Sequence, residues 1–137
     1  MYETILLPID GSEGSARAEE FALELAERYG AALHTIHVVD TRMRSEPALS
    51  SMELVTDEAE AAANELLRAV EEEATDRNVE CTCRCCHGVP HEEIVSYADE
   101  VGADVIVMGY QGQTHEQRMG SVVQRVLQDT DRPVLAV

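Results

Sequence analysis

Short apolar runs alternate along the chain with longer segments in which apolar residues recur every three or four positions. A short apolar run between turn residues is typical of a buried strand, and the longer spacing is typical of an amphipathic helix. The pattern predicts strands over residues 4–9, 32–39, 79–86, 104–108 and 133–137. It predicts helices that end at Gly30, cover about 53–76, run from Pro90 to Gly102, and begin near Gly120.

The helical stripes also predict which side chains face the core. The segment 40–51 has no such stripe and contains Pro47 and three serines, so we expect a mobile surface loop there. The predicted inward-facing residues, helix by helix, are Ala18, Phe21, Ala22, Leu25 and Tyr29; Ala59, Ala62, Ala63, Leu66 and Val70; Ile94, Tyr97, Ala98 and Val101; and Val123, Val126 and Leu127.

Strands that alternate with helices predict an α/β fold, because a helix is the usual connection between parallel strands. The chain of 137 residues is long enough to fold as one domain, and we see neither an internal repeat nor a second domain. We therefore expect a single domain over residues 1–137, built as an open parallel five-stranded sheet with helices on both faces. If the first and fourth strands are central neighbours, the strand order is 3-2-1-4-5.

Two loops have the composition of a ligand site. In open α/β sheets, ligands bind beyond the carboxyl ends of the strands, where neighbouring strands send their chains to opposite faces. The segment 8–12 follows the first strand there, and the segment 109–121, with Gly109, Gly112 and Gly120, follows the fourth. Glycines let the backbone approach an anion, and a helix start offers N–H donors. The pattern therefore indicates a nucleotide or another phosphorylated ligand.

Each feature also has a purely structural interpretation. Glycine after a strand is common in plain turns, and Asp10 and Ser12 are suited to cap the following helix. His34 and His37 lie on the second predicted strand, where we expect packing against the sheet. His115 lies in the glycine loop and is either a solvated loop residue or a phosphate contact.

The charge balance excludes several classes of protein. The chain has 27 acidic and 10 basic residues, a net charge of −17, and every basic residue is an arginine. Without lysine it is not a Walker-type kinase, a pyridoxal enzyme or a typical phospho-acceptor receiver domain. Such an acidic surface repels nucleic acid and anionic membranes. An acidic excess without lysine is what we expect of a protein that stays soluble in concentrated salt, where charges are screened within about 3 Å at about 1 M. We therefore expect a halophilic origin.

The chain shows no sign of membrane insertion or export. No apolar run approaches the roughly 20 residues of a membrane span, and no signal peptide precedes the first predicted strand. Four cysteines in a chain of this length fit a reducing compartment better than a disulfide framework. We therefore expect a soluble, cytoplasmic protein.

The cysteines cluster in the segment 81–86. Cys81, Cys83 and Cys85 share one face of the third predicted strand at spacings of about 6.6 Å. Thiolates bound to one zinc lie about 2.3 Å from it and within about 4 Å of each other, which a regular strand does not allow. We expect small buried hydrophobic residues and no metal site. The alternative is a metal bound at the strand end by Cys85, Cys86, His87 and His91.

Several motifs together resemble the universal stress protein family. They are Pro-Ile-Asp-Gly-Ser at 8–12, His-Val-Val-Asp at 37–40, Ala-Asp-Val-Ile-Val-Met-Gly at 103–109, and Arg-Pro-Val-Leu-Ala-Val at 132–137. The resemblance covers the whole chain. It implies a Rossmann-like fold of the adenine nucleotide α-hydrolase-like type, with ATP, alone or with Mg²⁺ or Mn²⁺, as the ligand.

The resemblance also implies roles for particular residues. Gly109 and Gly112 would hold phosphate, and Gly120 and Ser121 would bind it from the helix start. Asp10 would bind the ribose or adenine side. The full set of implied cofactor-binding residues is Pro8, Ile9, Asp10, Val38 through its backbone at the adenine edge, Met108, Gly109, Gly112, Arg118, Gly120, Ser121, and Val122 beside the ribose and phosphates.

The glycine loop departs from the family motif. Nucleotide-binding members have the pattern Gly-x2-Gly-x9-Gly-Ser/Thr, whereas this chain has seven residues between Gly112 and Gly120. The shorter loop also carries Glu116, which would repel a triphosphate unless it points away, and Arg118, which could offset it.

No acid, base and nucleophile converge in the sequence, so we expect no catalytic residues. The resemblance implies a stress-response regulatory module that binds ATP or a related adenine nucleotide and signals to a protein partner. It also implies a homodimer through the C-terminal strand, where residues 134–137 form an apolar edge. The alternatives are a protein-interaction module of the same fold that binds no nucleotide, and a slow ATP hydrolase.

Overall fold

The computed structural model describes the backbone of residues 2–43, 49–111 and 119–137, and their side chains except those of residues 43 and 49–56. The elements, in chain order, are β1 (Thr4–Pro8), α1 (Glu13–Tyr29), β2 (Ala32–Asp40), the 3-10 helix η1 (Thr41–Met43), α2 (Leu49–Asp76), β3 (Cys81–Gly88), α3 (Pro90–Val101), β4 (Val105–Met108), α4 (Ser121–Asp129) and β5 (Val134–Ala136). None of the described helices is long and apolar enough to cross a membrane.

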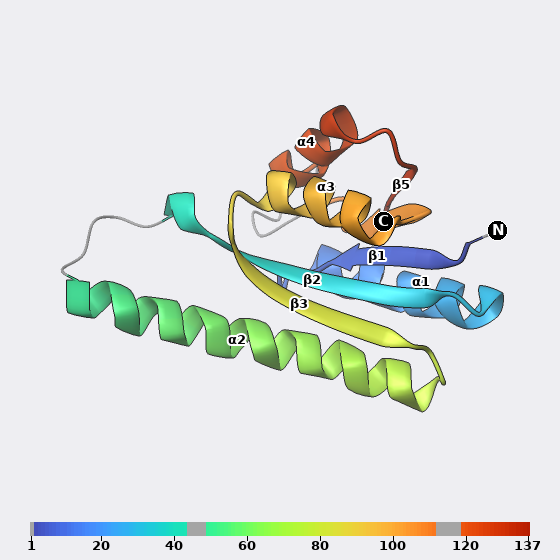
Figure 1. Ribbon diagram of the computed structural model, residues 1–137, viewed down its shortest axis with the longest axis horizontal. Helices are drawn as coiled ribbons and strands as arrows, with labels where there is room; N and C mark the ends of the chain where they lie inside the picture. Colours follow the sequence, from blue (N-terminus) through green and yellow to red (C-terminus); the bar gives the residue numbers. More distant parts are fainter. Residues whose placement is uncertain (1, 44–48, 112–118) are drawn as a thin grey trace.

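The strands form one parallel sheet in the order β3-β2-β1-β4-β5, which confirms the predicted topology. Helices α1 and α2 cover one face, and α3 and α4 cover the other (Figure 1). β4 and all of β1 after Thr4 are apolar and buried, because both faces of these central strands are covered.

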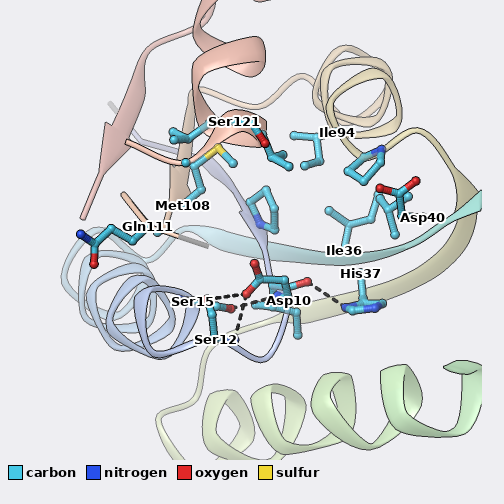
Figure 2. Close-up of a pocket in the computed structure, with 18 residues that line it drawn as sticks. Asp10, Ser12, Ser15, Ile36, His37, Asp40, Ile94, Met108, Gln111 and Ser121 are labelled. Carbon is cyan, nitrogen blue, oxygen red and sulfur yellow. Dashed lines mark hydrogen bonds between the residues drawn. The ribbon is translucent and has the colours of Figure 1, made fainter. Parts of the chain in front are cut away.

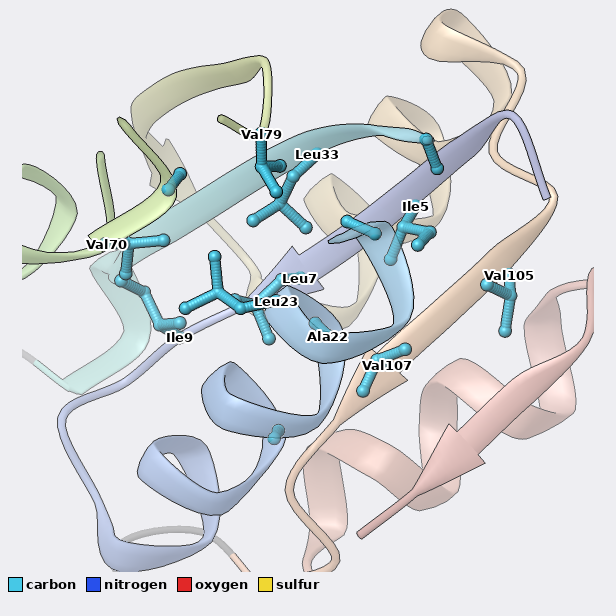
Figure 3. Packing of buried hydrophobic residues seen from close by; sticks show 14 of the residues in the cluster. Ile5, Leu7, Ile9, Ala22, Leu23, Leu33, Val70, Val79, Val105 and Val107 are labelled. Atoms are coloured by element: carbon cyan, nitrogen blue, oxygen red, sulfur yellow. The ribbon is translucent and has the colours of Figure 1, made fainter. Parts of the chain in front are cut away.

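Each face of the sheet has its own hydrophobic core. Under α1 and α2, Leu7, Leu23 and Leu33 pack together with Val70 of α2 (Figure 3). On the other face, Leu6 and Ile106 pack against residues of α3 and α4. Since odd and even residues of a strand point to opposite faces, the short run of β1 contributes to both cores.

The ends of α1 and α3 match their predicted signals. The Oγ of Ser12 accepts a hydrogen bond from the backbone N–H of Ser15 at 3.1 Å, which caps α1. Gly30 and Gly102 follow α1 and α3 in the left-handed conformation, with φ of 65° and 67°.

Some side chains predicted to face the core are exposed. Phe21 is 43% exposed, Tyr29 51% and Leu127 42%, and Ala62 is also exposed. Helix α1 buries Leu23 and Ala26 as well as Ala18 and Ala22, because it packs against α2 as well as the sheet. The buried stripe is therefore rotated away from Phe21 and Tyr29.

The segment 40–51 was expected to be a loop, and this is wrong at both of its ends. β2 continues to Asp40, Thr41–Met43 forms the 3-10 helix η1, and α2 begins at Leu49. Residues 44–48 lie outside the described residues. The serines at the end of this segment belong to the first turn of α2, so the absence of an apolar stripe did not exclude a helix.

The cysteines of β3 share one face as predicted, but they are half-buried. Since β3 is an edge strand, Cys81, Cys83 and Cys85 pack against the core under α2 without being enclosed. Burial, followed by the neighbouring Cys81 and Glu71, raises the pKa of the Cys83 thiol to about 12. This thiol is therefore protonated, and a poor nucleophile, at neutral pH.

The alternative metal ligands are paired with other groups. The Nε2 of His87 lies 2.6 Å from the Oε1 of Glu60, and the Nε2 of His91 lies 3.7 Å from the Oδ2 of Asp129. Across the described ranges, no three His, Cys, Asp or Glu side chains are placed to hold one ion. His34 packs edge-on against the ring of Tyr97, as expected for a histidine on the sheet.

Candidate functional site

A cavity of about 380 Å³ opens at the carboxyl ends of β1, β2 and β4, under the N-terminal ends of α3 and α4 (Figure 2). We call it the carboxyl-edge cavity. Its lining is mostly apolar, with a few polar groups, as in a small-molecule site. The lining residues are Pro8, Ile9, Asp10, Ser12, Ser15, Ile36, His37, Val38, Asp40, Pro90, Ile94, Met108, Gly109, Gln111, Gly120, Ser121, Val122 and Val123.

Asp10 is held in a closed set of hydrogen bonds at the start of α1. Its Oδ1 accepts from the backbone N–H of Ser12 at 2.9 Å and from the Ser12 hydroxyl at 2.5 Å. The backbone N–H of Asp10 donates to the Oγ of Ser15 at 3.1 Å. The predicted capping role of the segment is therefore real, and the same bonds orient the carboxylate at the edge of the cavity.

His37 fixes the chain just before Asp10. Its Nδ1 lies 2.9 Å from the carbonyl oxygen of Ile9. Because a carbonyl only accepts, Nδ1 carries the proton in this bond. The N–H of Ile9 donates to the carbonyl of Ile36 at 2.9 Å, so both peptide groups of Ile9 are tied to β2. His37 thus positions the segment that carries Asp10.

The backbone of Val38 faces the cavity. The carbonyl of Ile36 accepts from β1, so the peptide groups of Ile36 lie on the β1 side of β2. Residues two apart in a strand direct these groups to the same side. Val38 therefore also points toward β1, but β1 ends at Pro8, which pairs with Ile36. Because no strand residue of β1 lies opposite Val38, its N–H and C=O are directed into the carboxyl-edge cavity.

Asp40 places a second carboxylate in the cavity wall. Its Oδ1 accepts from the backbone N–H and the Nε of Arg42 at 2.9 and 3.1 Å, and its Oδ2 accepts from the Nη2 at 3.1 Å. The hydrogen bonds from Arg42 lower the pKa of the Asp40 carboxyl below its usual value. Asp40 is therefore an ionised acceptor at neutral pH.

Gly109 lies where two stretches of backbone come together. A Cβ at Gly109 would lie 2.6 Å from the carbonyl carbon of Gly14 and 2.9 Å from the nitrogen of Ser15. A Cβ at Gly14 would in turn collide with the carbonyl oxygen of Gln111. The glycine after β4 is thus required by the packing of α1 against this turn, a role that the sequence pattern did not predict.

Backbone hydrogen bonds join the residues at the two ends of the glycine loop. The N–H of Gly120 donates to the carbonyl of Tyr110 at 2.8 Å, and the N–H of Tyr110 donates to the carbonyl of Val137 at 2.8 Å. Gly120 is the N-terminal boundary residue of α4, and no described side chain caps this helix. Among the described residues, no side chain accepts from the N–H groups of the first turn of α4, which begins at the cavity.

Every predicted cofactor-binding residue that the structure describes lines this one cavity. These residues lie in β1, β2, β4 or α4, or in the connections directly after β1, after β4 and before α4. Gly112 and Arg118, like His115 and Glu116, lie outside the described residues. None of the described lining residues is an arginine or lysine. Within the described lining, the groups suited to hold an anion are backbone N–H groups and hydroxyls.

Sequence reasoning missed half of the lining. Ile36 and Asp40 share the face of β2 that carries Val38, so their even spacing was a usable signal. The contribution of α3 had no comparable signal, because it depends on how that helix lies over the sheet. The missed residues are Ser12, Ser15, Ile36, His37, Asp40, Pro90, Ile94, Gln111 and Val123.

The comparisons with known proteins agree over the whole chain. Universal stress protein MJ0531 of Methanocaldococcus jannaschii is 36% identical over 140 residues, which cover 100% of this chain and 82% of that protein. The structure of UspA from Lactobacillus plantarum matches with a TM-score of 0.90 and 26% identity, over 99% of this chain and 97% of that one. The structure of the universal stress protein from Archaeoglobus fulgidus in complex with dAMP matches with a TM-score of 0.74 and 26% identity, over 98% and 97% of the two chains. The family model of the universal stress proteins matches residues 1–137. This chain therefore belongs to the universal stress protein family.

Proposed function

We propose that this protein binds ATP or a related adenine nucleotide in the carboxyl-edge cavity and acts as a regulatory module. The observation that carries the proposal is that one cavity combines the strand edge at Val38, the carboxylate of Asp10 and the N-terminus of α4. Each suits a different part of a nucleotide. The dAMP complex of the Archaeoglobus fulgidus relative supports the same ligand class.

The base would lie between the apolar side chains at the β2 end. Ile36, Val38 and Ile94 offer apolar surface there, and the peptide edge of Val38 offers one donor and one acceptor. Adenine presents a matching acceptor and amino donor on adjacent ring positions. Asp10, oriented by Ser12, would accept from ribose hydroxyls.

The phosphates would lie at the other end of the cavity, near Gly109, Gly120 and Ser121. The N-terminus of a helix binds anions through its N–H groups and its dipole. Mg²⁺ or Mn²⁺, where present, would be carried mainly by the phosphates and would neutralise part of their charge. This role suits a cavity whose described lining has no arginine or lysine.

The regulatory role would follow from the backbone hydrogen bonds that join the two ends of the glycine loop. Phosphate bound at Gly120 acts on a residue hydrogen-bonded to Tyr110, and Tyr110 is hydrogen-bonded to the end of the chain at Val137. A nucleotide would thereby stabilise one arrangement of the surface beside β5, which a protein partner could recognise.

We also propose that two copies pair through β5. This strand lies at the edge of the sheet, and Leu135 is 37% exposed on it. An apolar edge strand invites pairing with another strand unless something covers it. A second copy of the chain would supply that cover.

The test is isothermal titration calorimetry of the protein with ATP, ADP and AMP, with and without MgCl₂, in concentrated KCl. We expect saturable binding with one site per chain. Asp10→Asn keeps an oxygen that can accept from the N–H and hydroxyl of Ser12 but removes the charge, so affinity should fall about tenfold, as for a lost charge-assisted hydrogen bond. Asp99→Asn, which breaks an Asp–Arg pair away from the cavity, is the matched control and should leave affinity unchanged.

The alternatives give different results in the same samples. Absence of binding heat at millimolar nucleotide would overturn the proposal and favour an interaction module that binds no nucleotide. Release of ADP or AMP over hours, abolished by Asp10→Ala, would favour a slow hydrolase over a regulatory module. Nucleotide recovered intact after hours would contradict hydrolysis.

A further inference from the structure

We propose that Asp40 is a specificity-determining residue that reads the 6-amino group of the purine, together with the backbone carbonyl of Val38. The inference rests on the proposed nucleotide function and goes beyond it, because it assigns base recognition to a carboxylate. It predicts that the protein prefers 6-amino purines over purines that lack the amino group.

The position of Asp40 places it at the base end of the cavity. Asp40 and Gln111 lie at opposite sides of the cavity in Figure 2, with Ile36 and Ile94 on the same side as Asp40. Gln111 belongs to the end where the first turn of α4 would receive phosphate. A nucleotide that extends through the cavity would therefore bring its base, and not its phosphates, to Asp40.

The geometry of β2 brings Asp40 close to the recognition edge. Val38 and Asp40 are two residues apart, so their Cα atoms are about 6.6 Å apart and their side chains share one face. The register ends the pairing of β1 with β2 at Ile36, so both residues extend past the end of β1. If a ligand amino group donates one hydrogen to the carbonyl of Val38, the carboxylate of Asp40 can accept its other hydrogen.

The carboxylate of Asp40 keeps acceptor capacity for a ligand. Its Oδ1 already accepts two hydrogen bonds from Arg42, whereas its Oδ2 accepts one. A carboxylate oxygen has two lone pairs, so one position on Oδ2 is left. Arg42 fixes the side chain and adds no donor on that remaining position. Asp40 therefore presents an acceptor to the base.

The chemistry of the amino group matches these two acceptors. Adenine N6 carries two hydrogens, one on the side of N1 and one on the side of N7. The carbonyl of Val38 would accept the first and the Oδ2 of Asp40 the second. A 6-oxo purine would instead direct an oxygen at both acceptors, which costs affinity because acceptors left facing one another are unsatisfied.

The test is a thermodynamic cycle between a residue and a ligand group. Dissociation constants are measured by calorimetry for ATP and for purine riboside 5′-triphosphate, which lacks only the amino group, with the wild-type protein and with Asp40→Ala. Wild type should bind ATP at least tenfold more tightly, and Asp40→Ala should reduce this ratio about tenfold, the scale of a hydrogen bond to a charged group. Because the phosphates are identical, any effect of the released Arg42 on them cancels in the ratio.

Two further variants separate recognition from structure. Asp40→Asn keeps an oxygen acceptor and should restore part of the ratio, whereas Asp99→Ala should leave the ratio at the wild-type value. An unchanged ratio in Asp40→Ala, with both nucleotides still bound, would overturn the role of Asp40 and leave the proposed function intact. If wild type binds neither nucleotide, the proposed function itself fails.

Discussion

At the scale of single residues, Gly109 is a tightly constrained position in the cavity lining. Replacing Gly109 with alanine should lower the free energy of unfolding by about 1–3 kcal/mol, the usual cost of an added methyl group in a packed interior. The cause is the backbone of Gly14 and Ser15, which a Cβ would approach within 3 Å. Urea unfolding in concentrated KCl measures the effect.

Gly102→Ala is the comparison for this variant. A Cβ at Gly102 meets nothing within 4 Å, but its φ of +67° disfavours a side chain, so we expect a loss of about 1 kcal/mol from backbone strain. A Gly109→Ala protein that unfolds at the wild-type urea concentration would contradict the close approach of α1 and the β4 turn.

At the scale of elements, the packing of α1 against α2 brings acidic side chains together. Burial, followed by Glu73 and Glu20, raises the pKa of the Glu19 carboxyl. A folded-state pKa above the unfolded value means that the ionised group destabilises the fold at neutral pH, and that this cost disappears as pH falls through the folded pKa. Glu19→Gln should therefore stabilise the protein at pH 8 by about 0.5 kcal/mol, the scale of a screened surface pair.

The dependence on pH identifies the cause. Urea midpoints at pH 8, 6.5 and 5 should show the gain of Glu19→Gln shrinking toward acid pH, as a growing fraction of wild-type Glu19 becomes protonated. Glu72→Gln, on the exposed side of α2, should give a smaller change. A Glu19→Gln gain that grows as pH falls would rule out a raised pKa as its origin.

At the scale of the whole molecule, the proposed assembly depends on β5. Leu135→Asp puts a charge on the exposed apolar edge and should convert a dimer to a monomer, as measured by light scattering in concentrated KCl. Thr82→Asp places the same charge on an exposed residue of β3, at the opposite edge of the sheet, and should leave the mass unchanged. A monomeric wild type, or a Leu135→Asp protein that stays dimeric, would exclude pairing through β5.

The sequence by itself determined the order of elements, the buried central strands and the parallel topology. These are local consequences of burial: a strand covered on both faces must be apolar throughout, and a helix on a sheet must carry a stripe. The glycine loop and the loop that carries Asp10 could also be predicted from the sequence, because backbone conformation and helix capping depend on residues nearby in the chain.

Only the tertiary structure decided which side chains complete the cavity. Asp40, His37 and Ile94 line it because the pairing of β1 with β2 ends at Ile36, two residues before Val38, and because α3 lies over that end. The packing of Gly109 on Gly14 and the exposure of Phe21 likewise depend on where α1 lies relative to β4 and α2. Contacts between elements distant in the chain leave no periodic trace in the sequence, so the fold and the loops of the site could be predicted from it while the contribution of α3 could not.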